Sequence, residues 1–105
     1  MRITNITDYE IIFSNGKTIS YDHDQQCCEY NYADFKQLDD LARVCDFSED
    51  LKFERVDDCG FRFGDERQMF FVPCYTEQNG YYSSDVDIYY GGHKVLTVDG
   101  EWKDR

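Results

Sequence analysis

The chain has 105 residues, the size of one ordinary domain, and 41% of them are hydrophobic, which is enough for a single core. It carries 22 acidic and 11 basic residues, giving a formal net charge of −11. This charge opposes direct binding to nucleic acid phosphates or to an anionic membrane surface. It favours basic proteins, cationic ligands or metal ions as partners. We therefore expect one acidic domain over residues 1–105.

Neither a targeting peptide nor a membrane span is indicated by the hydropathy pattern, because no apolar run approaches the roughly 18 residues of a span. The cysteines number five, an odd count. Without a signal peptide, that count indicates free thiols in a reducing cytosol. We expect a cytoplasmic protein that makes no contact with a membrane.

The first predicted element is a β-hairpin. Two β-prone runs, residues 8–13 and 18–21, flank the dipeptide Asn15-Gly16. Asn-Gly is a strong hairpin signal because a type I′ turn needs positive φ at two successive residues.

A helix is predicted over residues 32–45, with Asn31 as its N-cap. Its apolar residues recur at helical spacing and form one stripe. The members of that stripe are Phe35, Leu38, Leu41, Ala42 and Cys45.

The rest of the sequence predicts strands, at residues 51–56, 60–64, 68–77, 81–90 and 95–98. A second Asn-Gly pair, at Asn79 and Gly80, predicts a two-residue turn that pairs residues 68–77 with residues 81–90. That register places Met69, Phe71, Val86 and Ile88 in the core.

The same register turns Asp85 and Asp87 away from the core, on a face shared with Tyr89, and makes Cys74 a candidate further member of a polar pocket wall on that face. The last hairpin is predicted to turn either at Gly91-Gly92 or over residues 91–94. Trp102 is expected to close the core from the tail. Together these elements predict an α+β fold, with an antiparallel sheet of six or seven strands and one helix packed on a face. The order is two strands, the helix, then a meander.

Two segments of the chain resemble a known family. One reads His-Asp-Gln-Gln-Cys-Cys-Glu over residues 23–29, and the other reads Asn-Gly-Tyr-Tyr-Ser over residues 79–83. Together they resemble a family of small uncharacterised proteins, a domain of unknown function, from bacteriophages and prophages. The resemblance covers about 30 residues and implies no activity. It implies a phage or prophage origin, hence the cytosol of a bacterial host, and it marks the two segments as candidates for lying together in space.

The densest group of reactive side chains is His23, Cys27, Cys28 and Glu29. Imidazole and thiolate are zinc ligands, so His23, Cys27 and Cys28 form a candidate metal site. Completing a tetrahedron would need ligands from among Cys45, Cys59, Cys74 and His93. The alternative is that Cys28 is a small buried hydrophobic residue, with His23 or Glu29 making capping hydrogen bonds.

Two further hypotheses use the same cysteines. A thiol enzyme would take Cys27 or Cys28 as nucleophile and His23 or His93 as base. The acidic surroundings oppose it, because they raise a thiol pKa. A disulfide between Cys27 and Cys28 would be a redox switch, but its ring is strained. We therefore assign no catalytic residue.

Tyrosines interleave with acidic residues along the last third of the chain, a pattern that favours a protein-binding surface over nucleic acid binding. The sequence thus predicts a non-enzymatic interaction protein with an acidic, Tyr-rich face, and mimicry of nucleic acid charge is one version of that prediction. A zinc or ligand-binding module and a thiol enzyme are the alternatives. The candidate ligand or partner residues are His23, Cys27, Glu29, Asn79, Tyr81, Tyr82, Asp85 and Asp87.

Overall fold

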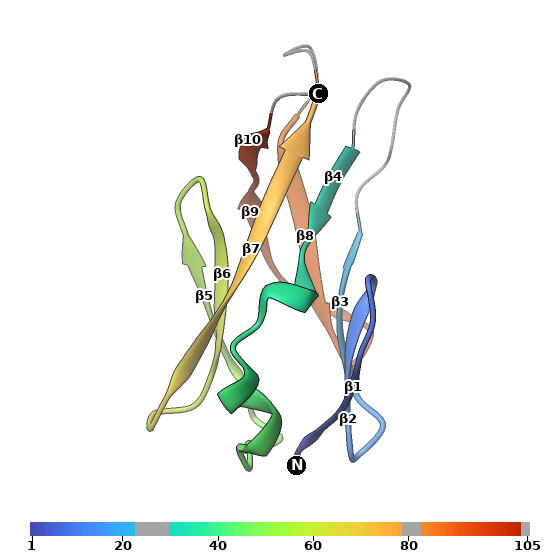
Figure 1. The fold of residues 1–105 in the computed structure, drawn as a ribbon, viewed down its shortest axis with the longest axis vertical. Coiled ribbons are helices and arrows are strands. Elements are labelled where there is room, and N and C mark those ends of the chain that lie inside the picture. Colours follow the sequence, from blue (N-terminus) through green and yellow to red (C-terminus); the bar gives the residue numbers. More distant parts are fainter. Residues whose placement is uncertain (23–29, 79–82, 104–105) are drawn as a thin grey trace.

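The computed structural model describes residues 1–22, 30–78 and 83–103. These residues form ten β-strands and two short 3₁₀ turns, arranged as two sheets that face each other. The domain is elongated, with principal extents of 41 × 22 × 20 Å, and the strands run along its length (Figure 1).

The first sheet has the order β1-β2-β3-β8-β9, and every neighbouring pair is antiparallel. Its strands are β1 (Ile3–Ile6), β2 (Glu10–Phe13), β3 (Thr18–Asp22), β8 (Asp85–Tyr90) and β9 (His93–Asp99).

The second sheet is built around β7, the longest strand. The first half of β7 pairs with β6, which pairs in turn with β5. The second half is flanked on opposite edges by antiparallel β4 and parallel β10, since both pair with residues 75–77. The strands are β4 (Tyr30–Ala33), β5 (Lys52–Val56), β6 (Gly60–Gly64), β7 (Met69–Glu77) and β10 (Glu101–Lys103).

The core lies between the sheets and is rich in phenylalanine. Phe13 of β2 meets Phe63 of β6 edge to face, with ring centroids 6.4 Å apart. Phe47, in the segment that connects β4 to β5, contacts both of those rings and Phe70. Edge-to-face rings suit the aromatic quadrupole, so the two edge-to-face contacts of Phe13 favour one orientation of the first sheet against the rest of the core.

The first and last predicted hairpins are confirmed. β2 pairs with β3 around residues 14–16, where Gly16 has φ +87° but Asn15 does not have positive φ, so this hairpin forms without a two-residue type I′ turn. β8 pairs with β9 around Gly91-Gly92, and Tyr90 faces His93. Both of these glycines have positive φ, as a two-residue type I′ turn requires. The structure thus selects the shorter of the two predicted turns.

The helix predicted over residues 32–45 is wrong. Asn31 is not an N-cap but lies inside β4, and the following residues form two 3₁₀ turns, Phe35–Gln37 and Asp40–Val44. The carboxylate of Asp39 accepts the N–H of Leu41 at 3.0 Å, which starts a new turn where a helix would continue. Part of the predicted stripe is nevertheless buried: Phe35, Leu38 and Ala42 point into the core, while Leu41 is exposed.

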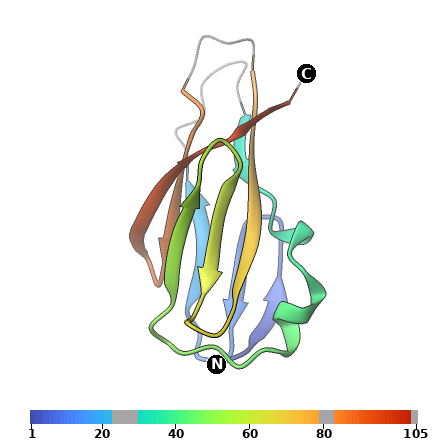
Figure 2. The same cartoon turned by 90° about the vertical axis from the view of Figure 1, so that its left-hand side faces the viewer.

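The hairpin predicted at Asn79-Gly80 is also wrong. β7 and β8 do not pair, because they belong to different sheets; Figure 2 shows β5, β6 and β7 in front of the blue strands of the first sheet. Val86 and Ile88 are buried as predicted, but β7 buries Phe70 and Val72 and leaves Phe71 41% exposed. Trp102 does not close the core, because it is 54% exposed.

The α+β class is therefore corrected to a β-sandwich: no α-helix packs on either sheet in the described residues. In that part of the chain, neither 3₁₀ turn has the length and apolar character that a bilayer span requires.

The adjacent residues Phe70 and Phe71 test the sandwich directly. Phe70→Ala should lower the free energy of unfolding by about 3–5 kcal/mol, because it opens a cavity in the core. Phe71→Ala should cost at most about 1 kcal/mol, because its ring faces solvent. Urea denaturation of both variants measures the difference. Equal losses in the free energy of unfolding would indicate that Phe71 is also a core residue, which would contradict the two-sheet arrangement.

Candidate functional site

Most of the predicted site residues lie outside the described part of the chain. Residues 23–29 include His23, Cys27, Cys28 and Glu29, and residues 79–82 include Asn79, Tyr81 and Tyr82. The zinc, thiol-enzyme and vicinal-disulfide hypotheses on residues 23–29 therefore stay predictions. Asp85 and Asp87 are the two predicted site residues that the structure describes.

Asp85 and Asp87 lie on the outer face of the first sheet. Their neighbours Val86 and Ile88 are fully buried, so strand alternation turns the two carboxylates outward, as predicted. Tyr89 shares that face. Cys74, which sequence reasoning placed with them as a possible pocket wall, lies in the other sheet and is buried.

Two acidic residues that sequence reasoning did not select stand opposite this pair. Asp22 of β3 faces Asp87, and Asp99 of β9 faces Asp85. Residues facing each other across an antiparallel pair have Cβ atoms about 4.5–5.5 Å apart, so each pair sets like charges side by side. We call these four carboxylates, together with Tyr89, the acidic face.

The acidic face contains few compensating groups. Arg55 donates to the Asp99 carboxylate at 2.6 Å, and the Thr97 hydroxyl donates to Asp87 at 2.6 Å. No ion pair joins Asp22, Asp85 or Asp87 to a cation among the residues described. Within the described residues, three of the four carboxylates therefore have no cation beside them, and of those three only Asp87 accepts a side-chain hydrogen bond.

A buried polar network holds the β8 end of this face. Asn31 of β4 is fully buried, and its amide donates to the Ser83 carbonyl at 2.7 Å and to the Asp85 carbonyl at 3.4 Å. Its side-chain oxygen accepts from the Thr76 hydroxyl at 2.5 Å. Gln78 donates to both Thr76 and Ser83, at 2.7 and 3.0 Å. The network thus fixes the start of β8 in one sheet against β4 and β7 in the other.

The remaining cysteine and histidine candidates do not converge. Cys45 donates to the Leu41 carbonyl and accepts from Gln68, while His93 is exposed at the β8–β9 turn. Burial raises the pKa of the Cys74 thiol, which disfavours the thiolate that metal binding and nucleophilic attack require. Over residues 1–22, 30–78 and 83–103, no three His, Cys, Asp or Glu side chains form a metal-binding group.

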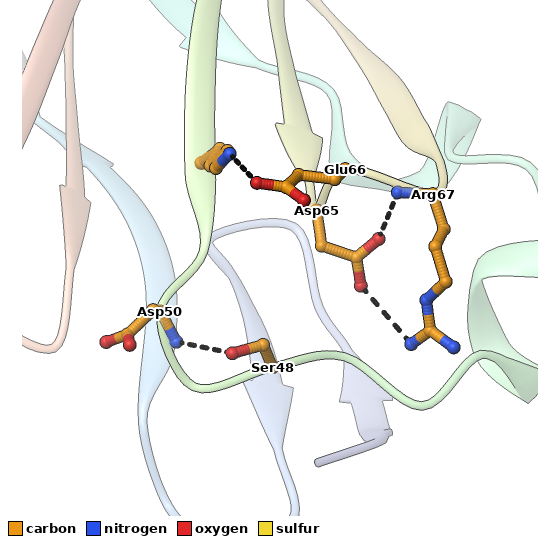
Figure 3. Close-up of a pocket in the computed structure, with 6 residues that line it drawn as sticks. Ser48, Asp50, Asp65, Glu66 and Arg67 are labelled. Carbon is orange, nitrogen blue, oxygen red and sulfur yellow. Dashed lines mark hydrogen bonds and ion pairs between the residues drawn. The ribbon is translucent and has the colours of Figure 1, made fainter.

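A pocket of about 430 Å³ lies at the other end of the sandwich, between the segment entering β5 and the β6–β7 turn (Figure 3). Four of its five charged side chains form ion pairs: Lys52 contacts Glu66 at 2.9 Å, and Asp65 contacts the Arg67 guanidinium at 3.7 Å. Asp65 also accepts the N–H groups of Arg67 and Gln68, at 2.9 and 3.3 Å. These interactions stabilise the turn, and we assign the pocket no ligand. Its lining residues are Ser48, Asp50, Lys52, Asp65, Glu66 and Arg67.

Comparisons of the chain with protein-family models, curated proteins and solved structures return no match. The resemblance to phage proteins therefore stays a prediction from the two quoted segments.

The Asn31 network predicts a large cost for a small change. Asn31→Ala should lower the free energy of unfolding by about 1–3 kcal/mol for each buried partner left without a hydrogen bond. Gln37→Ala is the control: it removes a side-chain amide that makes two hydrogen bonds on the exposed surface, where a loss of about 0.5 kcal/mol is expected. Urea denaturation compares them. Equal, small effects would show that the network does not hold the sheets together.

The Asp65 turn predicts a pH dependence. The backbone hydrogen bond from Arg67 is the main cause that holds the pKa of Asp65 below its ordinary value of 3.8. A carboxyl whose pKa is lower in the folded state stabilises the fold above that ordinary value, and the stabilisation is lost as the pH falls through the folded pKa. Wild type should exceed Asp65→Asn in stability at about pH 7, and the difference should shrink below about pH 4.

Urea denaturation of both proteins across this pH range measures the difference, with Asp50→Asn as the matched control from the same pocket. The carboxylate of Asp50 makes no hydrogen bond or ion pair with the described residues, so its variant should differ little from wild type at either pH. A difference for Asp65→Asn that is constant with pH would contradict the role assigned to its charge.

Proposed function

We propose that this protein is a non-enzymatic interaction protein that binds a basic segment of another protein through the acidic face. The observation that carries the proposal is the cross-strand opposition of Asp22 to Asp87, with no cation on either carboxylate within the described chain. Like charges directly opposite in a sheet destabilise it. A lysine or arginine from a partner would remove that repulsion on binding.

Charge acts here on specificity and on association rate more than on affinity. A face of one sign steers an oppositely charged partner and rejects one of like sign. The net charge of −11 adds a long-range attraction for the same positively charged partners. Tyr89, on the same face, supplies an amphipathic contact of the kind enriched at protein interfaces.

One version of this proposal is mimicry of nucleic acid charge, in which the carboxylates compete for a basic groove. It requires the same surface and differs only in what the partner otherwise binds. A phage or prophage origin and a cytoplasmic location belong to the proposal as well, and they rest on the sequence.

Neutralising Asp22 and Asp87 together tests the proposal, because stability and binding should move in opposite directions. The double variant Asp22→Asn with Asp87→Asn should raise the free energy of unfolding by roughly 0.2–1 kcal/mol, since it removes the repulsion. It should weaken binding of a lysine- and arginine-rich peptide about tenfold if two contacts of about 0.7 kcal/mol each are lost. Calorimetric titration at low and high salt measures binding.

The matched control is Glu49→Gln with Asp50→Asn, which changes the net charge equally at the other end of the molecule. It should alter peptide affinity much less, and affinity of wild type should fall steeply with salt. If both double variants lose affinity equally, the attraction comes from net charge alone and the acidic face is not the binding surface.

A further inference from the structure

A lysine of the chain lies against a tyrosine cluster on the outer face of the second sheet. Lys103 of β10 places its Nζ atom 4.0 Å from the centroid of the Tyr75 ring. The same ammonium donates to the Tyr32 hydroxyl at 3.4 Å. A cation this close to a ring face is attracted by the negative face of the aromatic quadrupole.

The tyrosines that receive this ammonium are ordered by one another. Tyr32 faces Tyr75 across the β4–β7 ladder, with ring centroids 5.6 Å apart. Tyr30 stacks on Tyr32 at 4.5 Å. The Tyr75 hydroxyl accepts from Gln37 at 3.0 Å. The rings therefore keep their places whether or not Lys103 is bound, because each is held by neighbours other than β10.

Carboxylates surround the cluster and complete a site for a cation. Glu77 of β7 pairs with Tyr30 of β4 on one side and with Lys103 of β10 on the other side. Asp34 accepts from Gln37 at 2.8 Å beside Tyr75. The hydrogen bond to Tyr32 is the main cause that raises the pKa of Lys103 above its ordinary value. The surroundings thus favour a positive charge at this position.

Lys103 is held by a weak element. β10 has three residues, all of them exposed, and its ladder runs to β7 alone among the strands described. Short edge elements with few buried contacts open at low cost in free energy. The ammonium of Lys103 can therefore leave the cluster without unfolding the sandwich.

We propose that the cluster of Tyr30, Tyr32 and Tyr75 beside Glu77 recognises a lysine or arginine side chain of an extended basic peptide, and that Lys103 fills this position in the free protein. The charge of the surrounding carboxylates and the resident ammonium both specify a cation. Because the cluster lies on the second sheet, this inference does not depend on the acidic face.

The experiment titrates the whole protein with a short arginine-containing peptide and with the same peptide carrying citrulline, which is isosteric and neutral. Lys103→Ala should bind the arginine peptide about two- to fivefold more tightly than wild type, the range that one exposed cation–π contact gives. The citrulline peptide should show no such gain. Tyrosine side-chain NMR signals should shift at Tyr32 and Tyr75.

Two variants keep the test decisive. Tyr75→Phe retains the ring and should bind as wild type does, whereas Tyr75→Leu should lose the gain in a Lys103→Ala background. All titrations are repeated with Asp22→Asn and Asp87→Asn present, so that binding at the acidic face is removed. If Lys103→Ala binds the arginine peptide no better than wild type does, or if citrulline binds equally well, the cluster is not a cation site.

Discussion

The arrangement of this domain depends on a small set of hydrogen bonds that join its two sheets. Asn31 binds Thr76 within its own sheet and carbonyl groups at the start of β8 in the other. A fully buried amide with these partners tolerates little change in the distance or register of the sheets. The network fixes the position of the first residues of β8 against the other sheet. Because side chains alternate along a strand, this position turns Asp85 and Asp87 outward.

Predictions from the sequence were correct for features that depend on residues close together in the chain, such as turns between consecutive paired strands. Gly91-Gly92 and the loop at Gly16 lie between strands that pair with each other, so turn chemistry and strand pattern agree. At Asn79-Gly80 the same dipeptide signal failed, because β7 buries Phe70 and Val72 against the opposite sheet instead of pairing with β8. The burial of Phe35, Leu38 and Ala42 was predicted correctly from a helix that does not exist. Consecutive 3₁₀ turns give a similar spacing of inward positions.

Sequence reasoning placed Asp85, Asp87 and Tyr89 on one outward face, but it missed Asp22 and the tyrosine cluster for the same reason. Asp22 pairs with Asp87, which lies 65 positions later in the sequence, and Tyr32 pairs with Tyr75, which lies 43 positions later. Neither contact leaves a short-range pattern. The signal that was available was compositional: excess acid and many tyrosines indicated a binding surface of this chemistry, but the positions chosen for it fell largely on residues 23–29 and 79–82.

The two surfaces lie toward the same end of the sandwich, where β3 and β7 end and β4 and β8 begin (Figure 1). They differ in what a partner must do. Under the proposal, a cation bound to the acidic face would relieve the repulsion between the opposed carboxylates, so binding would also stabilise the fold. At the tyrosine cluster a cation would first have to displace Lys103, and the apparent affinity would fall in proportion to the fraction of molecules in which Lys103 occupies the site. A partner with basic residues on one extended segment would thus find the acidic face open and the tyrosine cluster occupied by Lys103. How readily Lys103 leaves would decide how much affinity the tyrosine cluster adds to that of the acidic face.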